Sequence, residues 1–203
     1  MRRLPFFLAG LLFAGSAAAA EPDMRWEPLG GSQQRVGWAA EGLTAAPQIA
    51  ETFTAPMGYR VERYLWKAQK PAGAFALAIL RDLSEDDHYL SGPVDLMKFA
   101  TTMLKGLEAP TPKALEAADQ MVATGQGPVL ARRFELGLRQ CLVLGFYAEP
   151  QDKPNGATTA REEPLAEGSL RLDGVYCAAA GQPLTPQQVL AYAAGMKLQP
   201  AKN

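Results

Sequence analysis

The sequence predicts an α+β fold, an antiparallel β-sheet packed on one face by two or three α-helices and closed by one disulfide. Three observations predict this class. Runs of alternating or apolar residues recur along the chain and are separated by short turn signals, which favours antiparallel pairing. Other segments repeat apolar residues at helical spacing. The chain has 203 residues, 48% of them hydrophobic, so we expect a single domain, at 34–203.

The first twenty residues (1–20) are typical of a secretory signal peptide. Two arginines near the start are followed by an apolar run at 4–14 and by small residues at 18–20 that form a cleavage site. The apolar run is shorter than the ~20 residues that a membrane-spanning helix needs. We therefore expect cleavage after Ala20, a periplasmic or secreted protein, and no transmembrane segment after cleavage. An extended N-terminal arm is expected at 21–33.

Two hairpins and two single strands are predicted from alternation and turn signals. The segment 59–68 alternates apolar and polar residues, and a turn signal at 70–73 separates it from the apolar segment 74–83. These two segments should therefore form a hairpin. The second hairpin joins two strands through a turn at Gly137. The other expected strands are 34–39, 129–136, 140–148 and 169–178.

Two or three helices complete the predicted fold. Pro93 stands at the tolerated first position of a helix, and apolar residues then recur every three to four positions, which predicts an amphipathic helix of about fifteen residues. Thr185 and Gln188 fit a capping box at the start of a C-terminal helix. A shorter helix is expected at 114–121, after Pro112.

Cys141 and Cys177 are the only cysteines, and we expect them to form a disulfide. An exported chain reaches an oxidising compartment, where an even number of cysteines indicates disulfides. If the flanking strands pair antiparallel with the cysteines opposite each other, one face of the pair is almost entirely apolar. The other pairs are then Leu142 with Tyr176, Val143 with Val175, Leu144 with Gly174, Gly145 with Asp173, Phe146 with Leu172, Tyr147 with Arg171, and Ala148 with Leu170. A catalytic dithiol is the alternative, but such cysteines are usually close in sequence.

The composition excludes several kinds of site. One histidine excludes a site that needs two, and two cysteines exclude a four-cysteine zinc site or an iron–sulfur cluster carried by one chain. A net charge of −1 gives no broad attraction to nucleic acid or to an anionic membrane. No serine lies in a G-x-S-x-G nucleophile elbow. We therefore assign no catalytic, cofactor-binding or metal-binding residue, no cofactor and no nucleic-acid partner.

Glu85, Asp86, Asp87 and His88 form the densest polar cluster of the sequence. Three carboxylates beside the only histidine could bind a divalent cation or hold a general base. A solvated connection leading into a helix also explains them, because a helix N-terminus favours acidic residues. We favour this structural interpretation and keep the four residues as a possible polar site.

Tyr64 and Trp66 are the candidates for a partner surface. Aromatic residues crowd the N-terminal third of the chain, and aromatic side chains on a sheet could bind a sugar ring or an apolar anchor of a partner. Core packing is the commoner role of such residues. If the protein has an aromatic partner surface, we expect it at these two positions.

Taken as a whole, the patterns favour an exported, non-catalytic binding or accessory protein of the bacterial cell envelope. Its partner would be an envelope protein or a small ligand. Two alternatives stay open. A periplasmic carrier of a small ligand or lipid would enclose an apolar pocket between sheet and helix. A carboxylate-dependent hydrolase of cell-wall or polysaccharide material would bring two acids together in a cleft, one of them from 85–87.

Overall fold

The computed structural model describes residues 25–55, 58–68, 73–83, 90–91, 95–105, 110–148 and 167–199. The predicted signal peptide and its cleavage site lie outside these ranges. None of the helices within them has the length and apolar character that a membrane-crossing helix requires.

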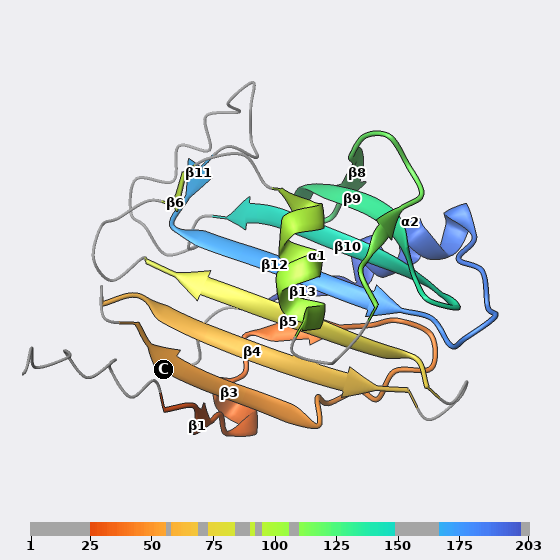
Figure 1. Cartoon of the computed structure of the whole chain (residues 1–203). Helices are drawn as coiled ribbons and strands as arrows, with labels where there is room; N and C mark the ends of the chain where they lie inside the picture. The colour runs from red at the N-terminus through yellow and green to blue at the C-terminus, as the bar shows by residue number, and fades with distance from the viewer. Residues whose placement is uncertain are drawn as a thin grey trace, which may run out of the picture.

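One large antiparallel sheet dominates the fold (Figure 1). Its strands, in spatial order, are β1 (Glu27–Pro28), β3 (Ile49–Thr54), β4 (Arg60–Lys67), β5 (Phe75–Asp82), β12 (Leu170–Cys177), β10 (Arg139–Ala148), β9 (Gly127–Leu136) and β7 (Lys113–Ala114), and β8 (Gln120–Thr124) also pairs with β9. Two small ribbons join β2 (Val36–Trp38) with β13 (Met196–Leu198) and β6 (Leu90–Ser91) with β11 (Glu167–Gly168). The helices are η1 (Gly31–Gln33), α1 (Leu96–Lys105) and α2 (Pro186–Gly195).

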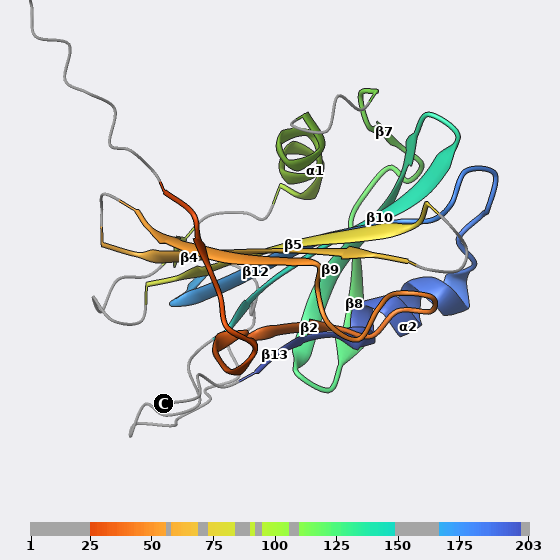
Figure 2. The same cartoon turned by 90° about the horizontal axis from the view of Figure 1, so that it is seen from below.

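The predicted α+β class, with helices covering one face of the sheet, is wrong. The large sheet has nine strands, whereas the described residues contain only two α-helices. These helices lie on opposite faces: α1 on one side, and α2 on the other together with the β2–β13 ribbon (Figure 2). The fold is therefore mostly antiparallel β.

The helix expected at 114–121 is also wrong, because this part of the chain pairs with β9. β8 turns back onto β9 through Gly125 and Gln126, which places Val122 opposite Val129. Val122 is buried, while Met121 and Ala123 on either side of it are exposed. That period of two residues is the pattern of a strand, and the partner strand decides it.

The predicted register between β10 and β12 is confirmed, since Cys141 lies opposite Cys177 and the flanking pairs follow as expected. The Cα atoms of the two cysteines are 4.1 Å apart, and their sulfur atoms form the disulfide. The hairpins β4–β5 and β9–β10 are confirmed as well. So is the capping box of α2, in which Thr185 Oγ1 accepts a hydrogen bond of 3.2 Å from the Gln188 N–H.

Each face of the sheet carries its own hydrophobic core. On one face α1 packs over the disulfide and its neighbours. On the other face the β2–β13 ribbon and α2 cover β4, β5, β12 and β10. Trp38 and Met196 of the ribbon pack against Gly174, where an added Cβ would lie 2.7 Å from the Met196 sulfur and 2.7 Å from the Trp38 ring. The face under the ribbon and α2 is therefore enclosed, whereas on the α1 face the side chains of β5 at 75, 77, 79 and 81 stay partly exposed.

Candidate functional site

Tyr64 and Trp66, the residues expected to offer a partner surface, are buried. Their exposed fractions are 1% and 0%, and their rings stack with centroids 5.6 Å apart. Trp38 of the β2–β13 ribbon contacts Trp66 edge-on, with the ring centroids 6.2 Å apart. The expectation of a partner surface at Tyr64 and Trp66 is therefore wrong, because the ribbon encloses that face of β4.

Glu85, Asp86, Asp87 and His88 lie outside the described residues, so the possible polar site there stays a prediction. Within the described ranges, no three His, Cys, Asp or Glu side chains are arranged to hold a metal ion.

A row of polar side chains crosses the face of the sheet on which α1 lies. Arg81 on β5 lies directly opposite Arg171 on β12, and Tyr147 on β10 lies opposite Arg171 on its other side. Side chains directly opposite each other in antiparallel strands share a face and lie close together. Because the two arginines carry like charges, this arrangement requires a counter-ion between them.

Asp173 is that counter-ion. Its side chain is 0% exposed and lies two residues from Arg171 on the same face of β12. Arg81 Nη1 donates to its Oδ2 at 2.7 Å. Arg171 donates to the same carboxylate from Nε at 2.8 Å and from Nη2 at 3.1 Å, and from Nη1 to the Tyr147 hydroxyl at 3.1 Å. One carboxylate thus orients two guanidinium groups.

The cluster of Arg81, Arg171 and Asp173, which we call the arginine cluster, carries one more positive than negative charge. Burial alone would lower the pKa of Arg171, but the hydrogen bonds and the attraction from Asp173 raise that pKa above its usual value. The side chains of Arg81 and Arg171 are 29% and 18% exposed, so solvent reaches both. Guanidinium groups bind phosphate and carboxylate oxygens in this way, often through two parallel hydrogen bonds.

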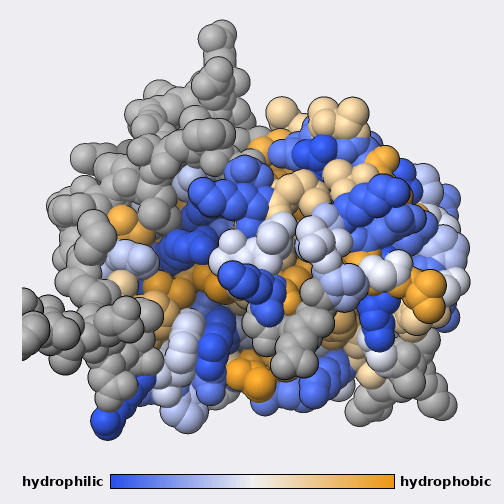
Figure 3. Space-filling view, in the orientation of Figure 1, coloured by the Kyte–Doolittle hydropathy of each residue, from blue (hydrophilic) through white to orange (hydrophobic). Residues whose placement is uncertain are grey.

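Arg81 is the more available of the two arginines. Within the described residues it donates to Asp173 from Nη1 alone. Its guanidinium carbon lies 5.9 Å from the ring centroid of Phe99 on α1, which borders the cluster. Figure 3 looks onto this face and shows hydrophilic and hydrophobic side chains interleaved on it. The arginine cluster is therefore a partly solvated cationic site.

A second polar cluster lies on the opposite face, between β4, β5 and the chain just before β2. Glu62 is 0% exposed, accepts a hydrogen bond from the Tyr64 hydroxyl, and has Arg60 Nε 2.9 Å from its Oε1. Arg35 pairs with Asp82, and the Arg35 N–H donates to the Tyr64 hydroxyl at 3.0 Å. Two arginines thus balance two carboxylates.

Burial dominates the electrostatics of this second cluster. It raises the pKa of Glu62, although the hydrogen bond from Tyr64 and the charges of Arg60 and Arg35 act in the opposite direction. It also raises the pKa of Tyr64, and the Glu62 carboxylate adds to that shift. Since both Glu62 and Tyr64 are enclosed, we interpret this cluster as a structural network.

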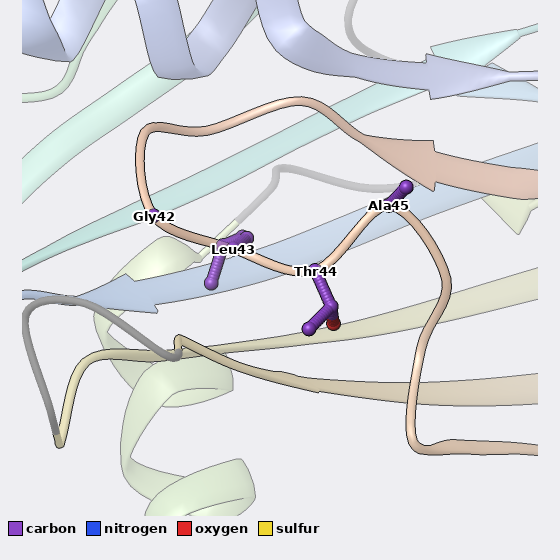
Figure 4. A pocket seen from close by; sticks show the side chains of 4 residues that line it. All are labelled: Gly42, Leu43, Thr44 and Ala45. Atoms are coloured by element: carbon purple, nitrogen blue, oxygen red, sulfur yellow. The ribbon is translucent and has the colours of Figure 1, made fainter.

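Figure 4 shows a pocket of about 280 Å³ that is lined by Gly42, Leu43, Thr44 and Ala45. All four residues belong to the loop between β2 and β3, and none is charged. The Thr44 hydroxyl already donates to the Ala46 carbonyl at 2.7 Å. This pocket is not the enclosed space between sheet and helix that a lipid carrier would need.

Comparison with protein-family models, with curated proteins and with solved structures finds no match for this chain. The geometry of the described residues is therefore the basis for a functional proposal.

The arginine cluster was not predicted from the sequence, although one of the two strand pairings that form it was. The register of the disulfide-linked strands already places Arg171 opposite Tyr147, with Asp173 on the same face. What the sequence did not supply was the pairing of β5 with β12, which brings Arg81 opposite Arg171. That pairing joins residues about ninety positions apart, and no local pattern predicts it.

Proposed function

We propose that this chain is an exported, non-catalytic binding or accessory protein of the bacterial envelope, and that it recognises an anionic group at the arginine cluster. The observation that carries the proposal is that Arg81 and Arg171 share the single buried carboxylate of Asp173. The cluster therefore has one net positive charge, which can attract a phosphate or carboxylate group of a partner or ligand.

The geometry suits recognition more than catalysis. Asp173 fixes both guanidinium groups before a ligand arrives, so little side-chain freedom is lost on binding. A hydrogen bond to a charged group contributes about 1.5–3 kcal/mol. Two such bonds from Arg81 sum to about 3–6 kcal/mol, which corresponds to a dissociation constant between about 6 mM and 0.04 mM for a small isolated anion. A larger natural ligand would add contacts of its own.

Export is supported by the disulfide between Cys141 and Cys177, because disulfides form and persist in oxidising compartments. The signal peptide proposed for 1–20 accounts for how the chain would reach such a compartment. N-terminal sequencing of the protein recovered after export should begin at Glu21. A chain that still carries residues 1–20 would contradict the proposed cleavage.

The carrier and the hydrolase stay predictions without an observation in their favour. The buried carboxylates of the described residues each pair with an arginine: Glu62 with Arg60, Asp82 with Arg35, and Asp173 with Arg81 and Arg171. Such pairing explains these acids as structural groups, and a hydrolase would have to rely on other acids.

Isothermal titration with inorganic phosphate, at constant ionic strength, tests the proposal. The unaltered protein should bind phosphate saturably, and Arg81→Gln should weaken binding at least tenfold, which corresponds to a loss of ~1.4 kcal/mol or more. Arg63→Gln is the matched control, because Arg63 lies on the same face but pairs with a single acid, Glu51, at 2.5 Å. An equal loss in both variants, or no saturable binding, would overturn the proposal. The same titration with acetate separates a phosphate site from a carboxylate site.

A further inference from the structure

No strand in the described part of the chain pairs with the outer edge of β8. β8 pairs with β9 on one side, and this pairing places Ala123 opposite Pro128. Because proline has no N–H, that pair cannot exchange hydrogen bonds. Hydrogen-bonded and non-hydrogen-bonded pairs alternate along an antiparallel ladder, so the pair Met121 with Leu130 exchanges none either. The backbone N–H and C=O groups of Met121 and Ala123 therefore point away from β9, toward the edge of the sheet.

No hydrogen bond from the described part of the chain reaches these four backbone groups. The side chains beside them are exposed as well: Met121 is 66% exposed, and Ala123 belongs to the exposed class. Proteins usually block an open edge with a charge or a proline. β8, with the sequence Gln-Met-Val-Ala-Thr, has neither.

The helix next to β8 is uncharged as well, and it lies on the face of β8 to which Val122 points. α2 packs beside β8 (Figure 2) and contains no charged residue. Its Leu190 is 55% exposed, although Val189 next to it is buried in the core. We call the outer edge of β8, with the side chains of Met121 and Ala123 on one face and α2 with Leu190 on the other, the β8–α2 edge.

We propose that the β8–α2 edge is the docking surface for a second copy of this chain, with the two β8 strands pairing antiparallel about a two-fold axis at Val122. Met121 of each copy then lies opposite Ala123 of the other, so that a large side chain meets a small one twice. Each of these pairs exchanges two backbone hydrogen bonds, and Val122 lies opposite its own counterpart.

Two features favour a second copy over a foreign strand. The two pairs are complementary in size. Of the two residues whose backbone groups point away from β9, Met121 is large and Ala123 is small, so each meets its opposite in the second copy. The pairing also opposes no like charges, since β8 and α2 carry none. An acidic or basic partner strand would find no countercharge on either element.

Sedimentation velocity of the exported protein over a range of concentrations tests this proposal. We expect a reversible dimer. The variant Met121→Lys/Ala123→Lys places like charges opposite each other in both pairs, and so does Met121→Glu/Ala123→Glu, so each variant alone should be monomeric. A mixture of the two variants should form dimers again, because both pairs then oppose opposite charges.

Leu138→Lys is the matched control, because Leu138 is 83% exposed in the turn between β9 and β10, outside the β8–α2 edge. It should dimerise like the unaltered protein. Circular dichroism checks that both double variants fold, which their exposed positions allow. The proposal is wrong if the unaltered protein stays monomeric at about 0.1 mM, if the double variants still dimerise alone, or if their mixture stays monomeric.

Discussion

Arg81 and Arg171 lie directly opposite each other on neighbouring strands, and one fully buried carboxylate, that of Asp173, holds both guanidinium groups in place. Like charges at directly opposed positions destabilise a sheet unless a counter-ion intervenes. The stability of the sheet and the charge of the proposed binding site therefore depend on the same aspartate.

Asp173→Asn should destabilise the protein by about 3 kcal/mol, because it leaves two guanidinium groups without their countercharge in a largely buried place. Urea unfolding measures the loss. Glu51→Gln is the control: it breaks a pair with Arg63 in which the two side chains are 26% and 42% exposed, and should cost about 0–1 kcal/mol. Equal losses in the two variants would contradict the role given to Asp173.

The disulfide should contribute about 4 kcal/mol to stability, because it closes a loop between cysteines 36 positions apart and so restricts the unfolded chain. We expect the variant Cys141→Ala/Cys177→Ala to lose that amount in urea unfolding, and the unaltered protein to lose a similar amount in the presence of a reductant. A loss below about 1 kcal/mol in both experiments would show that the bridge adds little to this fold.

Gly174→Ala should destabilise the protein by about 1–3 kcal/mol, since the added Cβ would lie 2.7 Å from both the Met196 sulfur and the Trp38 ring. Thermal unfolding followed by tryptophan fluorescence measures the effect. Gly31→Ala is the control, because an added Cβ there meets no atom within 4 Å. A variant as stable as the unaltered protein would mean that the β2–β13 ribbon is not firmly seated on the sheet.

Glu62 should make stability depend on pH. Burial raises the pKa of this carboxyl in the folded state, so the folded protein holds the proton more tightly than the unfolded chain. The resulting stabilisation is complete below the ordinary value of 4.5 and is lost as the pH rises through the raised pKa. Glu62→Gln removes the titration, so the variant should gain stability relative to the unaltered protein as the pH rises above 4.5.

Urea unfolding of both proteins at several pH values measures this difference. Glu51→Gln controls for the general effect of removing one carboxylate that is paired with an arginine. A stability difference between Glu62→Gln and the unaltered protein that stays constant, or that falls with pH, would contradict the raised pKa.

Local pairings could be predicted from the sequence because turns and cysteines restrict them. The turn at Gly137 fixes the hairpin β9–β10, and the requirement that Cys141 and Cys177 meet fixes the register of β10 and β12. In both cases one constraint determines the positions of a whole strand, since a slip of one residue would turn every side chain to the other face.

The layers on either side of the sheet could not be predicted in the same way. Alternation in β4 correctly separates its two faces, but it does not reveal that residues 36–38 and 196–198, from opposite ends of the chain, join to cover Tyr64 and Trp66. The arginine cluster depends on a similarly distant pairing between β5 and β12. Such contacts follow from the packing of the whole chain.

The proposed anion site can be observed directly by NMR titration with inorganic phosphate at constant ionic strength, following the Nε–Hε signals of the arginine side chains. We expect a saturable shift of the Arg81 and Arg171 signals, and no shift for Arg132 of β9, which pairs with Asp119. Signals of Arg81 and Arg171 that do not move, or that move no more than that of Arg132, would contradict the proposal.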